Sequence, residues 1–176
     1  GRESVLDLFG RIRKELPMLD RLRRYENEYA LESEEIRGSY SWVAMRQTTL
    51  RSGWVNPERT EQAYRLHRLL LELAPYFLSV SPLDVDHVEL VFGFDFEADR
   101  DRDEIIFEAL LADSPLAELI DRNREGVIDA QPFVGISIDE DPRMKAFIEI
   151  KTRPNRPGGI ETNDPISVYL TVRANG

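Results

Sequence analysis

Apolar residues near the start of the chain recur at three- and four-residue spacing, which is the pattern of a helix with one buried face. They are Val5, Leu8, Phe9, Ile12, Leu16, Leu19 and Tyr25. We therefore predict a helical segment over residues 3–31. Because proline removes a helical hydrogen bond, we expect a kink, or two helices meeting, at Pro17.

The next segment combines aromatic, β-branched and threonine residues between two glycines, which predicts one strand over residues 39–51. Helix signals follow directly. Asn56 can cap a helix, Pro57 suits its first position, and Pro75 is expected to end it. A second helical region is predicted over residues 101–122, restarting at Ser114 and Pro115.

Strict alternation marks the second half of the chain. Even positions of residues 87–97 are apolar, and three further segments, 132–138, 145–152 and 166–172, repeat this pattern. A period of two indicates strands with one face in a core. The Pro- and Gly-rich connection 153–165 is expected to be mobile.

These elements predict an α+β fold in the order α-β-α-β-α-β-β-β. We expect a two-layer sandwich in which helices cover one face of a mostly antiparallel or mixed sheet of roughly five strands. Residues 1–36 would form an N-terminal helical segment packed on a domain of residues 37–176. Phe92 and Phe94 should then be buried against the helices.

Charge and composition narrow the classes of function. The net charge is −10, so nucleic acid and anionic membrane surfaces are disfavoured as partners. The chain has no cysteine, which excludes disulfides, thiolate nucleophiles and thiolate metal sites. No apolar run approaches the ~20 residues of a membrane span. The first residue is Gly rather than Met, so we leave open that a leader or a membrane anchor was trimmed from the chain. We favour a cytoplasmic location over a secreted or anchored one.

Five carboxylates at every second position, from Asp95 to Asp103, resemble a calcium loop. Such a loop needs Gly at its sixth position and a carboxylate at its twelfth. Counted from Asp95, these positions hold Arg100 and Ile106. The acidic run is better explained as a helix start, where carboxylates complement the helix dipole. We predict no metal and no cofactor.

The odd-numbered face of the second-half strands carries the candidate chemistry. His87 and Glu89 lie at side-by-side spacing, and such a pair can transfer protons near neutral pH. With Asp95 they are the candidate catalytic residues. Charged pairs on an open sheet face are also common without catalysis.

The same odd face is the predicted binding surface. Its candidate residues are Phe133, Phe147, Tyr169, Lys151 and Arg173. Because bare aromatic patches are rare, we expect a cover: the N-terminal helix, a second copy in a homodimer, or a ligand.

Nucleophile, phosphate-loop and dinucleotide motifs are absent from the sequence. We therefore favour a non-catalytic module that binds a protein or a small ligand and that could belong to a longer chain. The alternative is a small hydrolase- or isomerase-type enzyme that uses the His and carboxylate group.

Overall fold

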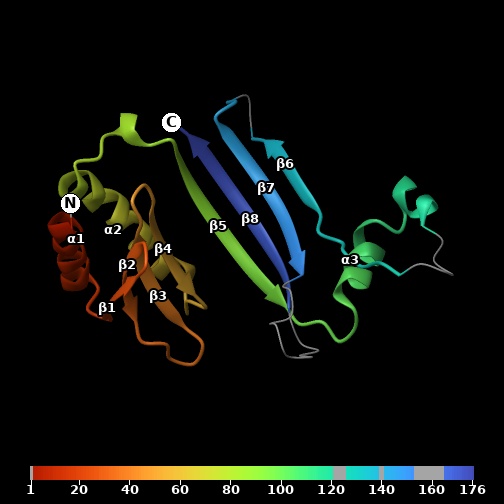
Figure 1. Cartoon of the computed structure of the whole chain (residues 1–176), viewed down its shortest axis with the longest axis horizontal. Coiled ribbons are helices and arrows are strands. Elements are labelled where there is room, and N and C mark those ends of the chain that lie inside the picture. The colour runs from red at the N-terminus through yellow and green to blue at the C-terminus, as the bar shows by residue number, and fades with distance from the viewer. Residues whose placement is uncertain (1, 121–125, 139–140, 153–164) are drawn as a thin grey trace. The chain divides into compact units, whose positions relative to one another are not determined.

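The structure is a computed structural model that describes residues 2–120, 126–138, 141–152 and 165–176. The chain divides into two compact units, Gly1–Asp84 and Val85–Gly176. Each unit is described by itself (Figure 1). The expected boundary between residues 36 and 37 falls inside the first unit.

The first unit contains an antiparallel four-stranded sheet and two helices. Its elements are α1 (Arg2–Glu15), β1 (Leu19–Tyr25), β2 (Glu28–Ser33), β3 (Tyr40–Met45), β4 (Leu50–Val55), α2 (Thr60–Leu78) and the short 3-10 helix η1 (Pro82–Asp84). The strands lie in the order β1-β2-β3-β4, so each pairs with its neighbour in sequence.

The predicted helix over residues 3–31 is correct only for its first half. α1 ends at Glu15, two residues before Pro17, and the chain then turns into β1 and β2. The predicted kink is therefore a helix end, because the residue before a proline disfavours helical backbone. The apolar stripe of α1 is buried as expected, with Leu8 and Ile12 fully enclosed.

The predicted single strand over residues 39–51 is a hairpin. β3 and β4 are antiparallel, and the turn between them is closed by Arg46 N donating to Thr49 O at 2.8 Å. Gly and Pro are the residues that most often mark a turn, and this turn contains neither of them. The turn was therefore not predicted.

The helix α2 begins and ends later than predicted. Asn56 sits in the preceding turn with a φ of 44°, and its side chain donates to Gly38 O at 3.0 Å. Pro75 lies inside the helix rather than at its end. Its ring leaves the carbonyl of Leu71 without a helical partner, but Leu71 is exposed, so water can satisfy that carbonyl.

The core of the first unit lies between the two helices and one face of the sheet. It joins buried side chains of both helices, such as Leu8 and Leu66, to Leu31 of β2 and Val43 of β3. By strand alternation, the opposite face of this sheet points away from that core. We call it the outer face.

The second unit contains another antiparallel four-stranded sheet. Its elements are β5 (His87–Phe96), α3 (Arg102–Leu110), the 3-10 helix η2 (Pro115–Leu119), β6 (Phe133–Ser137), β7 (Met144–Thr152) and β8 (Ile166–Asn175). The order is β5-β8-β7-β6. The four predicted strands are confirmed, as is the α+β class. The 101–122 region is a short α-helix and a 3-10 turn, and residues 121–122 lie outside the described ranges, as do residues 153–164 of the predicted mobile connection.

The predicted burial of the even-numbered face of this sheet is wrong. Phe94 is 47% exposed and Phe92 is only partly buried. The cause is that α1 and α2 bury their stripes in the first unit, on a separate sheet. In the described part of the second unit, α3 covers one end of the sheet, where Ile106 and Phe107 pack near Ile150 and Ile166. The fold therefore has two sheets of four strands, not one sandwich.

None of the helices in the described ranges is long and apolar enough to cross a membrane.

Candidate functional site

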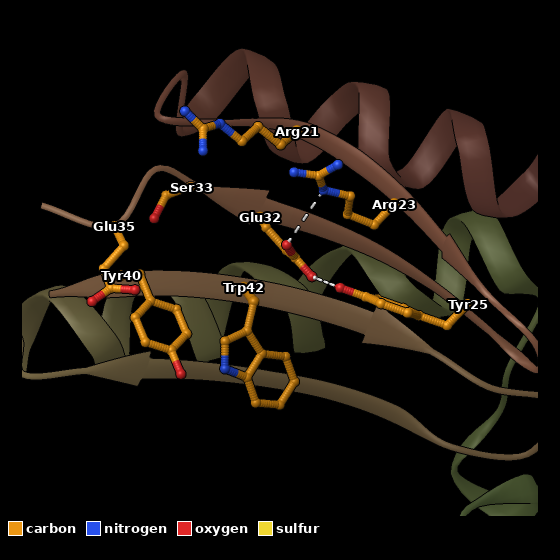
Figure 2. A pocket seen from close by; sticks show the side chains of 8 residues that line it. All are labelled: Arg21, Arg23, Tyr25, Glu32, Ser33, Glu35, Tyr40 and Trp42. Carbon is orange, nitrogen blue, oxygen red and sulfur yellow. Dashed lines mark hydrogen bonds and ion pairs between the residues drawn. The ribbon is translucent and has the colours of Figure 1, made fainter. Parts of the chain in front are cut away.

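A groove of about 380 Å³ runs over the outer face of the first sheet (Figure 2). Its lining is rich in aromatic and charged side chains from three strands and the loop after β2. The lining residues are Arg21, Arg23, Tyr25, Glu32, Ser33, Glu35, Tyr40 and Trp42. Tyr25 and Tyr40 are exposed, so the groove is open to solvent.

Trp42 occupies the floor of the groove because its neighbour on β4 has no side chain. Trp42 and Gly53 are directly opposite on β3 and β4. A Cβ atom at Gly53 would lie 2.5 Å from Cε2 of the indole, so the ring rests where that atom would be. Arg51 also places its guanidinium carbon 5.7 Å from the centre of the ring. Such a contact adds a cation–π attraction that helps to hold the indole against the sheet.

A second hollow of about 270 Å³ adjoins the groove and shares Tyr25, Glu32 and Trp42 with it. Glu28 also lines this hollow, and it accepts hydrogen bonds from Arg46 at 2.8 Å and from Arg51. Burial alone would raise the pKa of Glu28, but the two arginines outweigh it and lower the pKa. Arg51 is thereby fixed between Trp42 and a carboxylate.

Glu32 lies in the middle of the groove, and two side chains of β1 contact its carboxylate. The Tyr25 hydroxyl donates to its carboxylate at 2.8 Å, and Arg23 Nε stands 3.9 Å from the other oxygen (Figure 2). The hydrogen bond to Glu32 raises the pKa of Tyr25, because ionisation would lose the donor and bring two negative charges together. The tyrosine therefore stays a neutral donor at physiological pH.

Two donors in this groove form no hydrogen bond within the described part of the chain. The indole N–H of Trp42 and the hydroxyl of Tyr40 form no hydrogen bond with any described residue. Both belong to β3, two positions apart, so they lie on the same face of the strand. They are available to an incoming acceptor.

The candidate catalytic residues of the second unit lie on the odd face, but the structure does not bring them together. Asp95 is eight residues along β5 from His87, which is about 26 Å in an extended strand. Glu89 accepts from Arg173 Nε at 2.6 Å, and Asp95 accepts from the Ser167 hydroxyl at 2.6 Å. The expected contact between His87 and Glu89 does not appear as a hydrogen bond among the described residues.

Three of the five predicted binding residues contact one another. Phe133 and Phe147 are stacked, with ring centres 5.7 Å apart, and Arg173 lies 5.3 Å from the Phe147 ring. Of the other two residues, Tyr169 is opposite Glu149 on the neighbouring strand, and Lys151 pairs with that same glutamate at 2.9 Å.

The apolar stripe of the N-terminal helix, which was expected to cover this cluster, is buried inside the first unit. Phe133 remains 61% exposed.

The acidic stretch is a helix start, as predicted. Asp101 is the N-cap of α3, and its side chain accepts from Glu104 N at 3.0 Å. Asp103 accepts from Ala130 N at 2.9 Å and so fastens the loop before β6 to the helix. Among the described residues, no three His, Asp or Glu side chains form a group that could hold a metal ion.

His67 is a partly buried residue of α2. Its Nδ1 lies 2.7 Å from the Ser52 hydroxyl of β4. Burial lowers the pKa of His67, which favours the neutral ring.

The residue that sequence reasoning missed is Trp42. Its environment depends on the hairpin register, which the prediction of a single strand hid. The available signal was an aromatic residue in one β-rich stretch followed by a glycine in the next, since aromatic rings often cover cross-strand glycines.

Comparison with known protein families, curated proteins and solved structures gives no significant match to this chain.

Proposed function

We propose that the chain is a non-catalytic protein-interaction module and that the groove around Trp42 binds an extended peptide segment of its partner. One observation carries the proposal. Trp42 lies over Gly53 between two exposed tyrosines, and its indole N–H has no partner among the described residues.

The residue types of the groove favour a protein partner. Trp, Tyr and Arg are the side chains that most often dominate the energy of protein interfaces. Here they come together in Trp42, Tyr25 and Arg23. Trp42 is also held in place by Gly53 and Arg51, so binding would cost little additional side-chain entropy.

The shape of the site favours an extended segment over a small molecule. Small-molecule sites usually enclose most of their ligand. This site is open, and its two adjoining hollows meet at Glu32 and Trp42. A peptide crossing both hollows could accept hydrogen bonds from the Trp42 indole and the Tyr40 hydroxyl through its backbone carbonyls.

Selection from a display library of random linear peptides tests this proposal with the full chain as bait. We expect enriched peptides to bind the wild-type chain and to lose roughly 30-fold in affinity with Trp42→Ala, as for a hot-spot residue worth about 2 kcal/mol. The matched control is Tyr76→Ala, which removes an exposed aromatic of α2 and should change nothing. Failure to enrich any peptide, or equal binding to both variants, would contradict the proposal.

A second binding surface is favoured by the stack of Phe133 and Phe147 beside Arg173. An exposed aromatic pair next to a cation suits a flat or anionic group of a ligand. It would act independently of the Trp42 groove, and peptides or ligands that depend on Phe133 but not on Trp42 would reveal it.

The enzyme alternative receives no support from the geometry. General acid–base catalysis requires groups within hydrogen-bond reach of one reacting centre. His87 and Asp95 are separated by most of the length of β5, and Glu89 is engaged by Arg173.

A further inference from the structure

The second sheet has an apolar face that, in the described part of its unit, no helix covers beyond one end. This face, which we call the even face, consists of the even-numbered residues of β5, β6, β7 and β8. Its most exposed members are Val88, Phe94, Phe96, Val134, Ile136, Ile148 and Leu170. An antiparallel sheet normally buries one of its two faces, and within the described residues of this unit no second layer covers the rest of this face.

The even face is continuous across the whole sheet. Phe92 pairs with Leu170, Leu170 with Ile148, and Ile148 with Val134, so one row of apolar side chains crosses all four strands. Every charged residue within these four strands falls at an odd position. The face is therefore free of like charges that could oppose contact between copies.

The exposed apolar area matches the requirement of a stable dimer. From the exposed fractions, its side chains offer roughly 600–900 Å² per chain, against the ~800 Å² per partner of a standard interface. A monomer rarely leaves a patch of this size bare.

We propose that the even face packs against the same face of a second copy, forming a symmetric dimer with a β-sandwich at its centre. Two apolar sheets commonly pack in this way, about 10 Å apart and rotated by about 30°. A second copy suits this face because the face is self-complementary and uncharged, whereas the net charge of −10 is carried elsewhere. The stacked phenylalanines and Arg173 lie on the opposite face of the same sheet and stay outside the interface.

Sedimentation of the full chain tests the dimer, at concentrations up to about 100 µM because interfaces of this size have micromolar or tighter Kd. We expect a species of twice the 20.4 kDa of one chain. Phe94→Glu should weaken association at least about 100-fold, because it buries a charge in the interface. Val91→Glu is the matched control: Val91 is an exposed apolar residue of the same strand on the odd face, and its substitution should leave the dimer intact.

Circular dichroism of each variant checks that it is folded, and Phe94→Ala provides a milder second variant that should weaken the dimer in the same direction. A wild-type chain that stays monomeric overturns the inference. Hydrogen exchange then tells whether the face is covered by another part of the same chain or is open to a different partner. A dimer that tolerates Phe94→Glu, or that Val91→Glu dissociates, also overturns it.

Discussion

Trp42 and Gly53 face each other across the hairpin of β3 and β4, and the indole ring covers the glycine. The same relationship recurs twice in the second unit, where Tyr169 covers Gly93 and Phe147 covers Gly135. A ring that lies over a glycine shields the exposed backbone hydrogen bonds of the sheet and orients itself at the same time. In the first unit this pairing also builds the floor of the proposed binding groove.

Replacing Gly53 by alanine should displace the indole. The new Cβ would come within 2.5 Å of the ring, so the ring must move or the hairpin must strain. We expect unfolding to become easier by about 1–3 kcal/mol, as for overpacking, together with a change in tryptophan fluorescence. Gly10→Ala is the control. Its Cβ meets nothing within 4 Å, and in a helix it should stabilise by about 0.5–1 kcal/mol. Equal effects of the two changes in urea melts would contradict the close contact.

Lowering the pH should destabilise the first unit through His67. Burial lowers its pKa below the ordinary value of 6.5, so the unfolded chain binds this proton more readily than the folded chain does. The contribution of His67 to stability is therefore complete above the unfolded pKa and is lost as the pH falls through the folded pKa.

The wild-type chain should accordingly lose more stability than His67→Gln between about pH 7.5 and about pH 5, since the carboxylates titrate in both. The measurement is a urea melt at each pH, followed by tryptophan fluorescence. A His67→Gln curve parallel to the wild type would show that the ring is not desolvated.

Truncation of Leu66 should be among the most costly single changes in α2. Leu66 is fully buried, so Leu66→Ala should cost about 2–5 kcal/mol. Leu71, on the same helix, is 58% exposed, and Leu71→Ala should change stability by no more than about 0.5 kcal/mol. Thermal melts that rank the two in the opposite order would mean that α2 presents its other face to the sheet.

The N-cap of α3 should contribute measurably to the stability of the second unit. Asp101→Ala removes the acceptor for Glu104 N and should cost about 1 kcal/mol, whereas Asp101→Asn retains an acceptor and should cost less. Far-UV circular dichroism in urea follows both variants. If alanine and asparagine behave alike, the side chain does not cap the helix in solution.

The second sheet could be predicted from the sequence because every even-numbered residue from Val88 to Phe96 is apolar, and the later strands repeat this period of two. The first sheet could not. In β1 only Leu19 is buried, so the strand carries almost no alternating signal. Leu16, Leu19 and Tyr25 happen to continue the helical spacing of α1, and that spacing was the stronger local pattern.

Alternation identified the even face of β5 as apolar but could not say what covers it. The prediction assigned the helices to that face because a single sheet was assumed. Once residues 19–33 and 40–55 form a sheet of their own, both long helices are used there. Alternation also predicts that His87 and Asp95 lie on one face of β5, but it does not predict how far apart they are. The ~26 Å between them follows from the length of the strand.

The indole N–H signals of the full chain in an NMR titration test the central claim most directly. The chain has two tryptophans. Trp42 has an unpaired N–H among the described residues, while Trp54 donates to the Ser39 hydroxyl at 3.4 Å and packs against the core. On addition of a peptide selected as above, we predict that the Trp42 signal moves in proportion to binding and that the Trp54 signal stays in place. A bound peptide that leaves the Trp42 signal unchanged would contradict the assignment of this groove as the binding site.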